Sequence, residues 1–200
     1  MKQWKTVPIP EKMEHLERDK RGYPIPYIAG IDSNGTPDFK NNDNLKANLS
    51  VVFRKCSICG QRLQDDMWLI GAAISIFKDM GAFLDSLVHE ECGRYSLQVC
   101  PFLSTTAYQL SAKIEGAEGI GVSNRSPFMV FTKISDFRVG SGQYSNRYIV
   151  PLGKLQSIEY WSGGLQISNE KARELFNTDQ RIQNLIGPGK DFLTLPRWAD

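Results

Sequence analysis

The stretch Cys56-Ser57-Ile58-Cys59-Gly60 places two cysteines two residues apart, and His89-Glu90-Glu91-Cys92 repeats that gap later in the chain. Two such pairs form a Cys₃His set, a donor set found in structural zinc sites. The first pair fits a tight turn that directs two thiolates to one point, with Gly60 relieving backbone crowding. His89 and Cys92 share one face of a helical turn. We therefore predict one tetrahedral metal site, held by Cys56, Cys59, His89 and Cys92.

A further cysteine, Cys100, offers a competing set of four thiolates with Cys56, Cys59 and Cys92. Apolar residues recur on one helical face from about Ser86 until Pro101, so we expect a helix there. Eight helical residues rise about 12 Å, whereas two sulfur ligands of one zinc ion lie about 3.8 Å apart. Cys92 and Cys100 then cannot share an ion, and His89 takes the fourth place. A redox pair at Cys56 and Cys59, or an iron site, is the alternative interpretation.

A knuckle, a hairpin and then two ligands at the start of a helix is the order that defines a treble-clef zinc finger. Residues 54–100 resemble one. Trp68 to Ile76 would supply a buried strand or hairpin arm between the ligand pairs, with a helix as the rival assignment. We interpret Cys100 as a core thiol.

On the N-terminal side, we treat residues 1–22 as a polar tail, although residues 11–21 could form a short polar helix. Prolines make Tyr23 to Tyr27 extended, and Tyr27 to Ile31 continues as a strand. Asn34-Gly35 is a hairpin dipeptide, so Pro37 to Lys40 is expected to return as a partner strand. Leu49 to Arg54 is a further predicted strand. Residues 23–104 then form the zinc-binding module.

On the C-terminal side, residues 105–127 read as a linker or exposed loop, and residues 128–200 as an α+β half, separate or part of one domain with the first. Strands are predicted at Phe128–Ile134, Tyr148–Pro151, Leu155–Trp161 and Leu165–Ile167, and Gly140-Ser141-Gly142 as a loop. Ser168 can cap a helix through Phe176, and Thr178 or Asp179 another through Ile186. The fold class is α+β: a treble-clef-like zinc module joined to a small antiparallel sheet with C-terminal helices.

The composition is that of an ordinary globular chain: 200 residues, 41% hydrophobic, 23% charged, with a net charge of +2. Such a length buries a core without disulfides, and the balanced charge disfavours sequence-independent duplex binding. A charged N-terminus argues against a secretory signal, and the longest apolar run, Trp68 to Phe77, is too short to cross a bilayer. We expect a soluble, cytoplasmic protein without a membrane partner.

Catalytic patterns are weak. With His89 assigned to the metal, the other histidine, His15, is not expected near the site as a general base, and four protein ligands leave no open coordination position. Gly187-Pro188-Gly189-Lys190 lacks the spacing of a phosphate-binding loop. The sequence thus favours a structural zinc ion and a protein that is not an enzyme.

Two polar and aromatic clusters are candidate binding surfaces. The first joins the Arg21 to Tyr27 segment to Asp38, since rigid prolines position aromatic faces and Arg21 can hold a phosphate or carboxylate. The second groups Arg138 and Arg147 with Tyr144, Tyr148, Tyr160 and Trp161, which would suit stacking on a nucleotide. Ordinary sheet-edge, surface and core positions are the alternative for both. The candidate ligand-binding residues are Arg21, Tyr23, Tyr27, Asp38, Arg138 and Arg147.

The chain also resembles a group of uncharacterised zinc-binding proteins encoded by phages and bacterial genomes. The resemblance spans roughly residues 20–104 and is carried by the motifs Arg21-Gly22-Tyr23-Pro24-Ile25-Pro26-Tyr27, Pro37-Asp38-Phe39, Cys56-x-x-Cys59-Gly60, Ile70-Gly71, His89-x-x-Cys92 and Cys100-Pro101-Phe102-Leu103. It implies a cytoplasmic zinc-binding domain and no particular activity.

The expected function is that of a non-enzymatic, zinc-stabilised binding protein. A phage origin would make action on a host pathway plausible, through a protein partner or a small nucleotide-like ligand. The alternative is a nucleic-acid-binding zinc-finger protein, and a third possibility is an enzyme that uses Asp32 or Asp38. The oligomeric state stays open.

Overall fold

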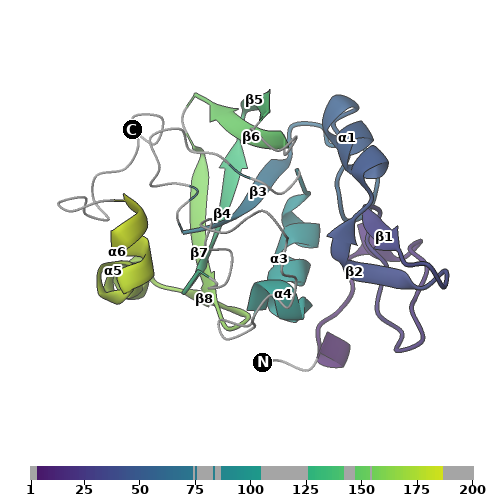
Figure 1. Cartoon of the computed structure of the whole chain (residues 1–200), viewed down its shortest axis with the longest axis horizontal. Coiled ribbons are helices and arrows are strands. Elements are labelled where there is room, and N and C mark those ends of the chain that lie inside the picture. Colours follow the sequence, from purple (N-terminus) through teal and green to yellow (C-terminus); the bar gives the residue numbers. More distant parts are fainter. Residues whose placement is uncertain are drawn as a thin grey trace.

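The structure is a computed structural model that describes residues 4–73, 75, 83, 87–104, 126–141, 147–153 and 155–186. It is a mixed α/β fold with antiparallel sheets, consistent with the predicted α+β class. Figure 1 shows helix α3 (Glu90–Val99) between a central sheet and a two-stranded hairpin, with helices α5 (Asn169–Thr178) and α6 (Gln180–Ile186) at the far end of the molecule. Among the described residues, no helix is long and apolar enough to cross a membrane.

The central sheet joins strands from both halves of the chain. Its order is β3 (Met67–Ala72), β4 (Met129–Ile134), β7 (Ser157–Ser162) and β8 (Leu165–Ile167), with all neighbours antiparallel. The predicted strands at these positions are confirmed, and strand is the correct assignment for β3. Pairing runs from Met67 with Ile134 to Ala72 with Met129. The second half of the chain therefore completes a sheet that begins in the first half.

Helix α3 packs closely on this sheet because one of its positions is a glycine. A Cβ atom at Gly93 would lie 2.5 Å from a ring carbon of Phe131 on β4. Phe131 in turn stacks on Trp68 of β3, with ring centroids 4.4 Å apart. The predicted helix is thus confirmed, although it begins at Glu90 rather than near Ser86 and continues into the short α4 (Pro101–Ser104).

The predicted hairpin is confirmed as β1 (Ala29–Ile31) and β2 (Pro37–Asn42), an antiparallel pair around a turn at Asp32 to Gly35. The predicted strand at Leu49–Arg54 is wrong, because helix α1 (Asn44–Val52) occupies most of it. Asp43 caps this helix by accepting hydrogen bonds from the backbone N–H groups of Leu45 and Lys46. The cap residue Asp43 lies outside the predicted strand at Leu49–Arg54, and it favours a helix over this segment.

The end of α1 is a Schellman motif, in which Lys55 N–H donates to the Ser50 carbonyl (2.7 Å) and Arg54 N–H to the Val51 carbonyl (3.3 Å). Arg54 takes the left-handed position with φ +47° and is the one described non-glycine residue with positive φ. Glycine is usual there, which is why the sequence pattern did not indicate a helix end.

Strands β5 (Asp136–Ser141) and β6 (Arg147–Leu152) form a separate two-stranded sheet. The prediction of a strand at Tyr148–Pro151 is confirmed, but β5 was missed: Gly140 and Ser141, expected in a loop, lie in it. A Cβ atom at Gly140 would lie 2.3 Å from the Tyr148 ring, so this glycine serves cross-strand packing. Farther on, Ser168 caps α5 through the Lys171 N–H, and α6 follows, as predicted.

The N-terminal segment packs onto the core, which contradicts its description as a polar tail. After η1 (Trp4–Thr6) and η2 (Glu11–Met13), Val7 and Met13 belong to the same buried cluster as the sheet residues. Ile9 and Leu16 of the same segment also pack against this cluster, although charged residues surround Met13 and Leu16 in the sequence. Residues 105–125 of the predicted linker lie outside the described residues.

Candidate metal centre

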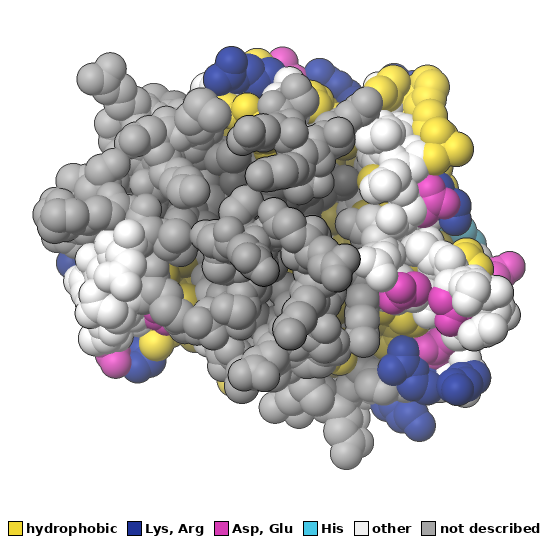
Figure 2. Space-filling view, viewed as in Figure 1, with side chains coloured by type: hydrophobic (Ala, Val, Ile, Leu, Met, Phe, Trp, Pro, Cys, Tyr) yellow, Lys and Arg dark blue, Asp and Glu magenta, His cyan; other side chains and the backbone are white. Residues whose placement is uncertain are grey.

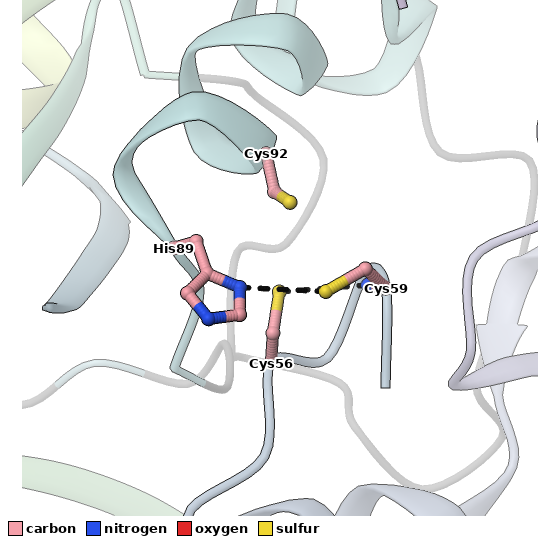
Figure 3. Close-up of side chains that lie close together, drawn as sticks. All are labelled: Cys56, Cys59, His89 and Cys92. Carbon is pink, nitrogen blue, oxygen red and sulfur yellow. Dashed lines mark hydrogen bonds between the residues drawn. The ribbon is translucent and has the colours of Figure 1, made fainter. Parts of the chain in front are cut away.

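The four predicted ligands come together at one buried point (Figure 3). One donor atom from each of Cys56, Cys59, His89 and Cys92 lies within 4.8 Å of all the others. Their residues are between 0% and 3% exposed. Three thiols and one imidazole, shielded from water and converging from two segments, could hold a metal ion.

The first pair sits on a tight turn built from backbone hydrogen bonds. Cys56 N–H donates to the Gln61 carbonyl and Gly60 N–H to the Cys56 carbonyl, both at 2.8 Å. Cys59 N–H points at the Cys56 sulfur, 3.5 Å away. Gly60 has φ +74°, and a Cβ there would lie 2.9 Å from the ring of Tyr27. The expectation that Gly60 relieves crowding is confirmed, since the turn and the Tyr27 ring both exclude a side chain.

The second pair is placed by the start of α3. His89 is its N-cap residue, and Cys92 lies in its first turn. Upstream, Val88 and Trp68 exchange two backbone hydrogen bonds of 2.9 and 3.0 Å, which anchors the segment beside β3. Cys100 is the C-cap of the same helix and lies outside the cluster, as the helical rise predicted.

Hydrogen bonds orient the His89 ring. Its Nε2 lies 3.2 Å from the Arg62 carbonyl oxygen, and its Nδ1 lies 3.3 Å from the Cys59 sulfur. A backbone carbonyl can only accept, so Nε2–H donates to it and Nδ1 faces the thiols. Second-neighbour contacts of this kind select the tautomer of metal-binding histidines. Nδ1 is therefore the atom that would bind a metal ion.

The donors share protons as a coupled set. Burial raises the pKa of the Cys56 thiol, but hydrogen bonds with Cys59, Cys92 and His89 outweigh burial and hold this pKa well below its usual value. Burial lowers the pKa of His89, yet its hydrogen bonds with Cys56 and Cys59 raise the pKa to about 10. Hydrogen bonds with the same two cysteines, and then burial, raise the pKa of Cys92. A divalent cation would replace the protons that these groups exchange.

A second histidine lies closer than expected. His15 Nε2 lies 3.0 Å from the Cys59 carbonyl oxygen, so the expectation that no other histidine would be near is wrong. Lys12 of the same segment forms an ion pair with Glu91, between His89 and Cys92. The N-terminal segment thus braces both ligand pairs, and His15 contacts backbone rather than the donor atoms. The charged sequence of residues 1–22 gave no indication of these contacts.

The first predicted ligand cluster is divided between two places. Tyr23 and Asp38 line a pocket of about 160 Å³ between the hairpin and α3, together with Phe39 and Cys100. The Arg21 side chain binds Asp19 and lies over the Phe39 ring, 5.4 Å from its centroid. Tyr27 instead packs over Gly60. Arg21 and Tyr27 are thus not among the residues that line this pocket.

The second predicted cluster does not assemble as expected. Tyr160 and Trp161 are buried, and the Trp161 indole N–H donates to Glu159. Arg138 is exposed on β5 opposite Val150, whereas Arg147 begins β6 opposite Ser141. Tyr144 lies outside the described residues. The two aromatic residues belong to the core because β7 lies inside the sheet, a placement that short-range pattern does not reveal.

A larger cleft was missed by the sequence reasoning. It measures about 550 Å³ and is lined by Val52, Phe53, Arg54, Lys55 and Arg62, on both sides of the knuckle turn. The run Val52-Phe53-Arg54-Lys55, basic and aromatic immediately before Cys56, is the signal that could have indicated it. Comparison of the chain with protein-family models, curated proteins and solved structures finds no match. The function is therefore inferred from the metal centre and the two pockets alone.

Proposed function

We propose that this chain is a zinc-stabilised binding protein whose metal has a structural role. The supporting observation is the buried Cys₃His set, in which the protein supplies all four donors of a tetrahedral ion. Three thiolates and an imidazole suit Zn²⁺, and a site with four protein ligands keeps no position for a substrate or a reactive water. Zinc would stabilise the arrangement rather than carry out a reaction.

The zinc module is proposed to be of the treble-clef type. Three observations support this assignment: the bridge between Lys55 and Arg62 around the first ligand pair, the bridge between Trp68 and Val88, and a helix that begins immediately after His89. In this arrangement the ion would join the knuckle turn to the start of α3, two segments that also meet through the hydrogen bond from the Ser57 N–H to the Leu87 carbonyl. Its binding energy is then folding energy.

The binding role is proposed because polar and aromatic residues surround two hollows next to the module. The smaller pocket, with Tyr23, Asp38 and Phe39, is the site proposed for a protein segment or a small nucleotide-like ligand. Action of a phage-encoded protein on a host pathway remains a prediction of the resemblance described above.

The zinc proposal is tested by a native mass spectrum of protein purified without chelator. We expect one zinc ion per chain, and we expect Cys92→Ala to lose the ion and to unfold at a much lower temperature. Cys100→Ala is the matched control, since it removes a thiol on the same helix outside the donor set. Full stability without metal, or equal effects of the two substitutions, would contradict a structural zinc ion.

A further inference from the structure

We propose that the cleft formed by Val52, Phe53, Arg54, Lys55 and Arg62, here called the basic cleft, binds single-stranded nucleic acid. The inference deepens the proposed function and rests on it, because the knuckle turn that would hold zinc also holds Lys55 and Arg62 opposite each other. Cys56 follows Lys55 directly, and Leu63 N–H donates to the Arg54 carbonyl at 2.7 Å. The walls of the cleft are thus part of the metal module.

The charged residues that line the basic cleft are all cations. Arg54, Lys55 and Arg62 all line it, and among the described residues no acidic side chain does. Within the part of the chain that the structure describes, neither Lys55 nor Arg62 is paired with a carboxylate. Arg54 is the exception, since its Nη2 lies 2.8 Å from a carboxylate oxygen of Asp136. Cations without internal partners attract an anionic ligand.

The positive charge also continues beyond the basic cleft. The ammonium groups of Lys55 and Lys46 lie 5.8 and 5.9 Å from the centroid of the Tyr27 ring. Lys55 therefore belongs both to the cleft and to this pair, so a fourth cation, Lys46, shares an aromatic neighbour with a cation of the cleft. Several neighbouring cations suit a backbone with repeated phosphates better than a single small anion.

The cleft wall next to these cations is apolar and exposed. Phe53 is 57% exposed and Val52 is 66% exposed. Figure 2 shows hydrophobic side chains on the surface at the corner where Figure 1 places α1. An aromatic face beside phosphate-binding cations is the usual arrangement for unstacked bases, which stack on the ring while the backbone follows the charges. A duplex would not offer its bases to this wall.

Arg54 supplies an independent indication. It occupies the left-handed position at the end of α1, where glycine would be conformationally easier. A strained residue at a cleft is a sign of a role that glycine could not perform. With Arg54 in this conformation, Phe53, Arg54 and Lys55 all line the same cleft.

The test is fluorescence anisotropy of a labelled oligothymidylate of about 15 nucleotides with the full chain, at several salt concentrations. We expect log K to fall with log salt with a slope of about −2, since three cations line the cleft. Phe53→Ala should weaken binding about ten-fold through the lost stacking. Lys171→Gln, a neutralised lysine on α5, is the matched control and should change nothing.

Two further variants separate binding from folding. Arg54→Gly keeps the helix end, because glycine is favoured there, and should weaken binding and reduce the salt slope by about 0.7. Asp136→Asn removes the carboxylate that pairs with Arg54 and should tighten binding. If Arg54 and Asp136 had only a structural role, Arg54→Gly would not change the salt slope of binding and Asp136→Asn would not raise the affinity.

Zinc content and melting temperature are measured on every sample, so the two proposals can fail separately. Folded, zinc-loaded protein that does not bind the oligonucleotide, or binds it equally after Arg54→Gly and Phe53→Ala, would overturn the basic cleft alone. Tighter binding of polyglutamate than of oligothymidylate would also overturn it, in favour of an acidic protein partner. Folded protein without zinc would overturn the proposed function.

Discussion

The metal module and the central sheet hold their parts together by different means. Around the metal centre, single bridges such as Lys55 with Arg62 join short segments. In the sheet, β3 and β4 pair over six residues each, and Trp68 stacks on Phe131 across them. A single bridge fixes few residues, so it offsets less of the entropy of ordering its segments than a six-residue pairing does, although apolar residues of both regions lie in one buried cluster. We therefore expect the ion to stabilise the metal module, as extended strand pairing and aromatic packing stabilise the sheet.

The largest effect on the difference between the metal module and the central sheet is expected from removal of the metal. We expect a strong chelator to expose the backbone N–H groups of the knuckle turn, at Cys56, Cys59 and Gly60, before those of β4. The binding energy of a structural zinc ion, about 10 kcal/mol or more, is comparable to the whole stability of a domain. Hydrogen exchange with and without chelator measures this order. Simultaneous exchange of both regions would show that they unfold as one unit.

Acid should act on the metal centre in the same direction as the chelator. Metal ligands must be deprotonated, so falling pH returns protons to the thiolates and the imidazole and displaces the ion. We expect zinc release, followed with a colorimetric chelator, to rise as pH falls, and to be complete before the far-ultraviolet circular dichroism of the strands is lost. Loss of the strand signal before zinc release would show that the sheet is less stable to acid than the metal module.

A smaller effect is expected where the two regions touch. Gly93→Ala would force a methyl group against the Phe131 ring, at a cost of about 1–3 kcal/mol for overpacking. In an exposed helix the same change would stabilise. Thermal unfolding measures the loss. The double variant Gly93→Ala with Phe131→Leu should recover part of it, because the shorter side chain leaves room, and simple additivity of the two losses would contradict this account.

The smallest effect is expected at the edge of the hairpin. Burial raises the pKa of Asp19, but hydrogen bonds from Arg21 and from the Tyr23 N–H outweigh it and hold the pKa below its usual value of 3.8. A lowered folded-state pKa adds stability above the unfolded value that is lost as pH falls through the folded one. Asp19→Asn should therefore cost about 1 kcal/mol at neutral pH and nothing in strong acid. Urea unfolding at both pH values tests this, with Asp32→Asn for comparison.

The metal site was predictable because its information is local. Two-residue spacings and a helical rise select four donors without knowledge of the fold, and the cap at Ser168 is equally local. The end of α1 was not predictable, since Arg54 occupies a position that glycine normally marks. His15 contacts the Cys59 backbone and Met13 joins the buried cluster through contacts that are remote in sequence, and a charged segment gives no sign of them. The basic cleft likewise exists only once Arg62 folds back beside Lys55.

Because β3 pairs with a strand that is synthesised much later, β4, the metal module can form before the central sheet does. All four proposed ligands, from Cys56 to Cys92, are made before β4 leaves the ribosome. Loop closure between β3 and β4 must wait for the residues in between, whereas the two ligand pairs meet over a shorter span. A nascent chain supplied with metal would thus present α3 already oriented, with Gly93 turned toward the place that Phe131 will fill. Metal supply during translation would then govern the yield of folded protein, even where the finished molecule keeps its ion indefinitely.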